Sequence, residues 1–187
     1  MPRKKKICIV VIGAESSGTR LATRLCIAAG CHGEATALGQ QQYGGWPQKY
    51  DVQEPEGETP IVIRRTMPYH PYRDWFDLHT FSERIEGWGY EVRVVVTVRE
   101  LGAVAASQRA HFYTESVERG EIECDRVHDI IDDWLTEQEY KHVWMDYEDL
   151  IKAPLKTINS TLWKVGIPKL TKLPFRIVDG NSKYMEK

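Results

Sequence analysis

An apolar run that leads into a short glycine-bounded loop dominates the start of the chain, in ICIVVIGAESSGTRLATRL (residues 7–25). The apolar residues predict a buried strand over Lys6–Ile12, and the spaced leucines after the loop predict a helix from about Gly18 to Ala29. Gly13 and Gly18 bound the loop between them. A strand, a glycine loop and a helix N-terminus place backbone N–H groups where they bind an anion. The alternative is a tight turn that needs glycine for packing alone.

Strands and helices alternate along the rest of the chain. Further strands are predicted in GEATALG, TPIVIRR, YEVRVVVTVRE and KHVWMDY, and further helices in PYRDWFDLHTFSERIEGWG, LGAVAASQRAHF, IECDRVHDIIDDWLTEQEY and APLKTINSTLWKVGIP. This alternation predicts an α/β fold, a three-layer α/β/α sandwich around a central parallel sheet of about five strands. Ligands of such sheets bind at the carboxyl ends of the strands. Three polar clusters, 15–20, 64–70 and 99–107, follow predicted strands there.

The size and charge of the chain restrict its partners. The 187 residues, 42% of them hydrophobic, predict a single domain over 1–187, with a basic tail at 1–5. A net charge of −2 argues against broad nucleic-acid binding. The four cysteines form no CxxC pair, and no apolar run reaches the roughly 20 residues of a membrane span. We therefore expect a cytoplasmic protein without membrane or nucleic-acid partners.

Residues 40–58 predict a long loop, either a substrate lid or a solvated insertion.

The glycine loop departs from the loops that bind ATP. The ATP-binding pattern GxxxxGK[ST] has a lysine where this chain has Thr19. A kinase also needs a hydroxyl for magnesium and an acid on a neighbouring strand, whereas the strand VRVVVTV ends in Arg99. The hydroxyls of Ser16, Ser17 and Thr19, with the guanidinium of Arg20, are available to an anion. We therefore expect a phosphate-bearing ligand that requires no metal.

Three segments together resemble the sulfotransferases that use 3′-phosphoadenosine 5′-phosphosulfate. ESSGTR looks like the family's 5′-phosphosulfate loop, and VVVTVRELGAVAASQRAHF is similar to its 3′-phosphate segment, with Arg99 and Ser107 at the family's spacing. VWMDYEDLIKAPLKTINSTLWKVGIP resembles the later stretch with a Tyr-Glu-Asp-Leu motif and a Pro-started helix. The three follow the family's order from Ile7 to Pro168. The resemblance implies a P-loop sulfotransferase fold that binds this donor and releases adenosine 3′,5′-bisphosphate.

The resemblance also implies roles for residues of the loop and of the 3′-phosphate segment. The loop residues that would hold the 5′-phosphosulfate are Gly13, Ser16, Ser17, Gly18, Thr19 and Arg20. Arg99 and Ser107 would hold the 3′-phosphate, because a guanidinium at a strand end can grip a phosphate with two hydrogen bonds. The alternatives are an ion pair of Arg99 with Glu100 and an ordinary small helix residue at 107.

The family places a basic residue two positions before the second loop glycine, where this chain has Ser16. Candidates to supply that charge from elsewhere are Arg20, Arg64, Arg65 and Lys183. His70, after the strand in VIRRTMPYH, is the predicted general base that takes the acceptor's proton, and Glu15 is the second candidate. The end of the chain, FRIVDGNSKYMEK, is expected to be a solvated tail, with the basic C-terminal loop that often closes the family's 3′-phosphate site as the alternative.

Three functions remain open on the sequence. The leading expectation is transfer of a sulfuryl group to a hydroxyl or amine of a small-molecule or sugar acceptor. A kinase-type phosphotransferase with a divergent loop would bind ATP with magnesium. A non-catalytic module would bind adenosine 3′,5′-bisphosphate without transfer, since Ser16 replaces the basic residue of the family's loop.

Overall fold

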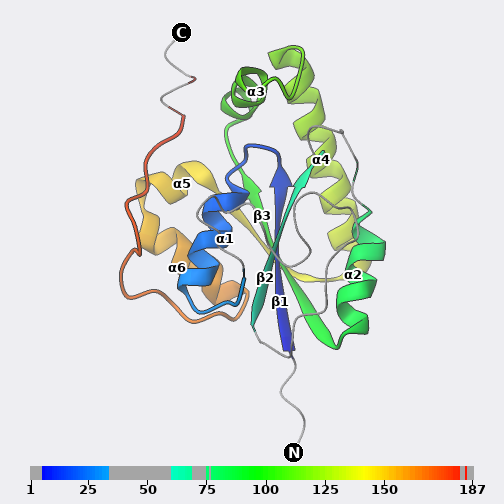
Figure 1. Ribbon diagram of the computed structural model, residues 1–187, viewed down its shortest axis with the longest axis vertical. Coiled ribbons are helices and arrows are strands. Elements are labelled where there is room, and N and C mark those ends of the chain that lie inside the picture. The colour runs from blue at the N-terminus through cyan, green and yellow to red at the C-terminus, as the bar shows by residue number, and fades with distance from the viewer. Residues whose placement is uncertain (1–5, 34–59, 69–74, 76, 182–183, 185–187) are drawn as a thin grey trace, which may run out of the picture.

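The computed structural model describes residues 6–33, 60–68, 75, 77–181 and 184, and these form an α/β fold around a parallel sheet (Figure 1). The strands are β1 (Lys6–Ala14), β2 (Ile61–Met67), β3 (Tyr90–Val98) and β4 (Lys141–Asp146), in the order β2-β1-β3-β4. The predicted α/β class with a parallel sheet is confirmed.

The prediction of about five strands is corrected to four for the described residues. The fifth was expected in GEATALG, of which only Gly33 is described. Just before it, His32 makes one isolated bridge to Ile61, with Val62 N donating to His32 O at 2.9 Å. A single bridge beside β2 is too short to count as a strand.

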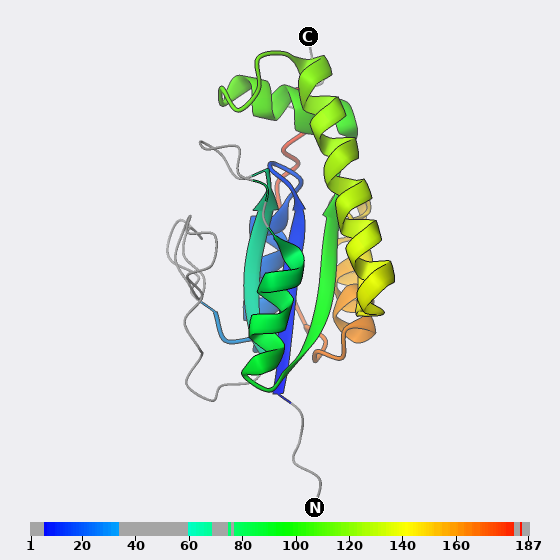
Figure 2. The ribbon, with the colours of Figure 1, turned by 90° about the vertical axis from the view of Figure 1, so that its right-hand side faces the viewer.

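Helices cover both faces of the sheet (Figures 1 and 2). On one face lie α1 (Thr19–Ala28), α5 (Tyr147–Lys152) and α6 (Pro154–Lys164), and on the other lie α2 (Leu78–Gly87) and α4 (Val117–Gln138). The short helix α3 (Leu101–Ala110) lies beyond the carboxyl end of the sheet, next to the start of α4. No helix among the described residues combines the length and apolar character needed to cross a membrane.

Side chains of β1 alternate between two apolar clusters, because successive strand residues point to opposite faces. Val10 and Ile12 pack in the cluster that includes residues of α2 and α4, whereas Ile9 and Val11 pack in the cluster that includes residues of α1 and α6. All four are fully buried. A central strand covered on both faces must be apolar throughout, which accounts for the uninterrupted apolar run in the sequence.

The strands that follow β1 in the sequence lie on opposite sides of it, β2 on one side and β3 on the other. Helix α1 leads from β1 to β2 on one side, and α2 leads back, on the opposite face of the sheet, to β3 on the other side of β1. Crossovers that diverge in this way leave a crevice at the carboxyl ends of the two strands, which is where doubly wound sheets bind ligands. The glycine loop follows β1, and Arg99 follows β3, so both lie at this point.

Two helices differ in extent from the sequence expectation. Helix α2 begins only at Leu78, where the Asp77 side chain caps it by accepting from Thr80 N at 3.1 Å. Helix α4 begins earlier than expected, at Val117, with Ser116 accepting from Arg119 N. Ile122, expected on the inward stripe of α4, is 59% exposed. In both helices the side-chain cap, rather than the apolar periodicity, marks the first turn.

Candidate functional site

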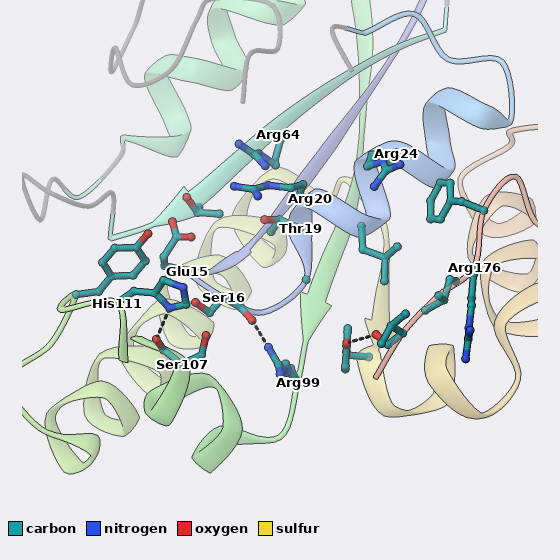
Figure 3. A pocket seen from close by; sticks show the side chains of 18 residues that line it. Glu15, Ser16, Thr19, Arg20, Arg24, Arg64, Arg99, Ser107, His111 and Arg176 are labelled. Carbon is teal, nitrogen blue, oxygen red and sulfur yellow. Dashed lines mark hydrogen bonds between the residues drawn. The ribbon is translucent and has the colours of Figure 1, made fainter. Parts of the chain in front are cut away.

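A pocket of about 450 Å³ opens at the carboxyl edge of the sheet, between the glycine loop, α3 and residues 175–178 (Figure 3). Its size is within the usual range for small-molecule sites. Among the residues that the structure describes, the charged ones that line it are one carboxylate and five arginines, namely Glu15 with Arg20, Arg24, Arg64, Arg99 and Arg176. This excess of guanidinium groups favours an anionic ligand, although the whole chain has a net charge of −2.

Backbone geometry gives the loop the character of an anion site. Ser16 and Gly18 have positive φ angles of 72° and 101°, on either side of Ser17. Alternation of left- and right-handed residues turns successive N–H groups toward one point. No side chain caps α1, so the N–H groups of its first turn, which have no intrahelical acceptor, are available to a ligand. Ser16, Gly18 and Thr19 all line the pocket.

Gly13 and Ser17, also predicted to contact the anion, do not line the pocket. The Ser17 hydroxyl is 2.7 Å from Thr97 Oγ1 in the buried interior. A Cβ atom on Gly13 would lie 2.5 Å from Thr97 O and from both hydroxyl oxygens. Gly13 therefore permits the close approach of the loop to β3, and Ser17 attaches the loop there. For these two residues, packing accounts for the sequence pattern.

Arg64 and Arg65 are consecutive on β2 but reach different surroundings. Arg64 is 4% exposed and lines the pocket. Burial lowers the pKa of Arg64 to about 10, a shift to which Arg20 contributes and which Glu15 opposes. Arg64 is therefore charged at neutral pH. Arg65, which we predicted as a catalytic cation, does not line the pocket; its guanidinium lies 5.0 Å from the centroid of the Phe81 ring, on the α2 face.

Arg99 connects the glycine loop to the end of the chain. Its Nε donates to Asn181 Oδ1 at 2.6 Å, and its Nη1 donates to Ser16 O at 3.0 Å. The guanidinium stacks on the Tyr147 ring at 4.7 Å. Ser107, 5% exposed on α3, lines the same pocket. The two residues predicted to form the 3′-phosphate segment are therefore brought together, but Arg99 already has protein partners.

The C-terminal residues form a wall of the pocket, so the expectation of a solvated tail is wrong for residues 175–181. Gly180 N donates to the Tyr147 hydroxyl at 2.9 Å, and that hydroxyl donates to Val178 O at 3.3 Å. Asn181 Nδ2 donates to Glu148 Oε1 at 2.6 Å. These contacts attach the segment to α5. Lys183, a candidate cation on the sequence, lies outside the described residues.

Among the described residues, three pocket residues each have a buried side-chain atom for which no hydrogen-bonding partner is found. The atoms are Glu15 Oε2, Thr66 Oγ1 and Arg99 Nη2. Most buried polar atoms in folded proteins have a partner, and each exception calls for an explanation. A ligand in the pocket that both donates and accepts hydrogen bonds would supply partners for all three.

Two residues of the pocket were not predicted from the sequence, although each lies four positions after a predicted site residue. His111 follows Ser107 by four positions, at the end of α3, and Arg24 follows Arg20 by four positions on α1. Residues four apart lie on one face of a helix, so this spacing was a usable signal. His70, the predicted base, and the loop 40–58 lie outside the described residues.

Metal-binding side chains do not gather in the parts of the chain that the structure describes, where no three His, Cys, Asp or Glu residues form a potential ion site. No protein-family model matches the chain, and no curated protein matches it. The assignment of a function therefore depends on the geometry and charge of this pocket.

Proposed function

We propose that the pocket binds 3′-phosphoadenosine 5′-phosphosulfate and that the protein transfers its sulfuryl group to an acceptor hydroxyl or amine. The observation that carries this proposal is the convergence of the glycine loop, five arginines and three unpartnered buried polar atoms on one pocket. The donor carries anionic groups at the 5′ and 3′ positions of its ribose. The pocket has arginines on two sides of the glycine loop that could bind these groups.

The loop end of the pocket suits the 5′-phosphosulfate. Backbone N–H groups of the first turn of α1 would contact the oxygens of the group, and Arg64 would lie beside them. Arg64 and Arg20 replace the loop cation that is missing at Ser16. As the sulfur–oxygen bond breaks, negative charge grows on the bridging oxygen, and preorganised N–H groups and guanidinium groups stabilise it.

The Arg99 end suits the 3′-phosphate. Arg99 Nη2 is a buried donor without a partner, and Ser107 faces the same pocket. An arginine that is already held by Asn181, Ser16 and the Tyr147 ring is fixed in position, so little side-chain entropy is lost when it binds a phosphate. On this proposal Phe175, which packs on the Arg24 guanidinium at 4.2 Å, offers an aromatic surface beside the ligand.

Two positions in the loop favour sulfuryl transfer over phosphoryl transfer from ATP. Thr19 stands where an ATP-binding loop has the lysine that contacts the β- and γ-phosphates, and Arg20 stands where it has the magnesium-binding hydroxyl. The strand end beside the loop carries Arg99 instead of a carboxylate. These residue types suit a donor whose transferred group carries less charge than a γ-phosphate.

Binding without transfer is the second candidate, and Ser16 favours it. If Arg64 and Arg20 do not take over from the absent loop cation, the pocket binds adenosine 3′,5′-bisphosphate and remains inactive. Incubation with the sulfate donor, with release of the bisphosphate measured by chromatography, separates the two: release faster than in buffer supports transfer, and tight binding without release supports the binding module.

Calorimetric titration with adenosine 3′,5′-bisphosphate, ADP, and ATP with magnesium tests the ligand. We expect the bisphosphate to bind at least tenfold more tightly than ADP, because only it engages Arg99. In Arg99→Ala, affinity for the bisphosphate should fall roughly 30-fold, the range of a charged hydrogen bond, whereas affinity for ADP should stay within about threefold of the wild type. Arg84→Ala, which removes a surface arginine stacked on Trp88, is the matched control. Tighter binding of ADP than of the bisphosphate would refute the proposal.

A further inference from the structure

The side of the pocket next to α3 differs from the rest in its hydrogen-bonding character. Glu15 and His111 lie there (Figure 3), and Tyr113, two residues after His111, also lines the pocket. The ring centroids of His111 and Tyr113 are 5.5 Å apart. Burial raises the pKa of Tyr113, and the charge of Glu15 raises it further, whereas the charge of Arg20 lowers it. These three side chains therefore form one cluster, which we call the α3-side cluster.

The His111 ring has a defined orientation. Its Nδ1 is 2.7 Å from Ser107 O, and a carbonyl oxygen only accepts hydrogen bonds, so Nδ1 carries the hydrogen. In the neutral ring Nε2 then has the free lone pair. The side chain is solvent-exposed at the end of α3, so a molecule that enters the pocket can reach it. A histidine with a fixed tautomer and an accessible Nε2 is suited to accept a proton.

Glu15 adds a second hydrogen-bond acceptor to the α3-side cluster. Its Oε2 is buried and has no partner, and its backbone O accepts from Gln108 Nε2 at 2.8 Å. Gln108 belongs to α3, so this bond ties the loop residue to the helix that carries His111. A ligand between the two side chains would have to bring hydrogen-bond donors, one for the carboxylate and one for the imidazole.

We propose that the α3-side cluster is the acceptor subsite of the transfer reaction, that His111 is the catalytic base there, and that the acceptor carries two neighbouring hydrogen-bond donors, as a diol or an amino alcohol does. This rests on the proposed sulfuryl transfer. His111 Nε2 takes the proton of the reacting hydroxyl while the hydroxyl oxygen bonds to sulfur. The bond from sulfur to the 5′-phosphate oxygen breaks, and its electron pair stays on that oxygen. Glu15 accepts the second hydrogen bond and orients the acceptor.

Water is a suitable probe, because it carries two O–H donors and the natural acceptor need not be known. The measurement is hydrolysis of the sulfate donor, followed as release of adenosine 3′,5′-bisphosphate. In His111→Asn the side-chain amide can still donate to Ser107 O, but Nε2 is gone. We expect hydrolysis to fall about 100-fold, the usual contribution of a general base, and bisphosphate affinity to stay within threefold of the wild type. In Glu15→Gln the expected loss is about tenfold.

The matched control is His142→Asn. His142 also has its Nδ1 close to a backbone carbonyl, 2.8 Å from Tyr140 O, but it lies near the amino end of β4 and does not line the pocket. It should keep the wild-type rate. Added imidazole should restore part of the rate of His111→Asn, which a purely structural loss would not allow.

Each outcome decides one question. Wild-type hydrolysis with an unchanged rate in His111→Asn overturns the role of His111 and leaves sulfuryl transfer standing. A parallel loss of hydrolysis and of bisphosphate affinity in His111→Asn assigns the residue to folding or donor binding and also overturns the role. If the wild type binds the bisphosphate but catalyses no hydrolysis, the proposed transfer itself fails, and the acceptor subsite fails with it.

Discussion

The two predicted anion anchors of the pocket differ in how much of their hydrogen-bonding capacity the protein itself uses. The glycine loop presents an uncapped helix N-terminus. Arg99, in contrast, already donates to Asn181 and to Ser16 and stacks on Tyr147, which leaves Nη2 as its buried donor without a partner. The loop is an open anchor, and Arg99 is a fixed one. When a ligand binds, the N–H groups of the glycine loop would form new hydrogen bonds. Arg99 would either exchange one of its existing hydrogen bonds for one to the ligand or add a further one.

The largest effect is expected at Gly13, where the glycine loop comes close to β3, and it is an effect on stability. Gly13→Ala places a Cβ atom 2.5 Å from the backbone oxygen of Thr97, which cannot move without displacing the strand. We expect a loss of about 3 kcal/mol in the free energy of unfolding and a fall of roughly 10 °C in Tm, measured by thermal denaturation. Gly87→Ala, where the added Cβ meets nothing within 4 Å, is the control. Equal stability of the two variants would show that the loop tolerates displacement from β3.

An intermediate effect is expected for the buried cation beside the open anchor. Arg64→Gln removes a charge from the pocket while keeping a polar side chain that can donate hydrogen bonds. Affinity for both adenosine 3′,5′-bisphosphate and ADP should fall roughly 10- to 100-fold in calorimetric titrations, because both ligands place a phosphate at the loop. This pattern differs from that of Arg99→Ala, where the loss is selective for the bisphosphate. A loss for the bisphosphate alone would place Arg64 at the other end of the ligand.

The smallest effect is expected at the fixed anchor. Asn181→Ala removes the amide oxygen that occupies Arg99 Nε, while Ser16 and Tyr147 still hold the guanidinium. If a 3′-phosphate competes with that oxygen, affinity for the bisphosphate should rise about threefold, the value of one hydrogen bond, and affinity for ADP should not change. Weaker bisphosphate binding would mean that Asn181 supports Arg99 for the ligand instead of competing with it.

The sequence predicts most of the frame of this fold because the frame depends on local patterns. The apolar run of β1, the glycine loop and the Pro-started helix α6 each have a periodicity or a turn residue that marks them. The start of α4 was misplaced because the cap at Ser116 lies outside the apolar stripe. Ser116 is a typical N-cap residue type, whereas the apolar stripe alone places the start of the helix later, at Ile122.

The candidate site was less predictable because its composition depends on faces and on long-range contacts. Arg64 and Arg65 are equivalent in the sequence, and only the packing of β2 decides that one reaches the pocket and the other reaches Phe81. The wall formed by residues 175–178 belongs to no helix or strand, so its sequence does not show where it lies. Its position follows from hydrogen bonds between Tyr147 and the backbone near Gly180, which join segments 33 residues apart.

The bonds of Arg99 have a consequence for when the site forms during folding. The arginine joins Ser16, 83 positions before it, to Asn181, 82 positions after it. Closing two such long segments costs chain entropy before any contact compensates it. During synthesis the glycine loop leaves the ribosome early, but its partner on β3 follows much later and the last wall of the pocket later still. On the proposed function, ligand binding would therefore be acquired only after nearly the whole described chain has folded, and a nascent or truncated chain that still lacks residues 175–181 would have the loop without the complete pocket.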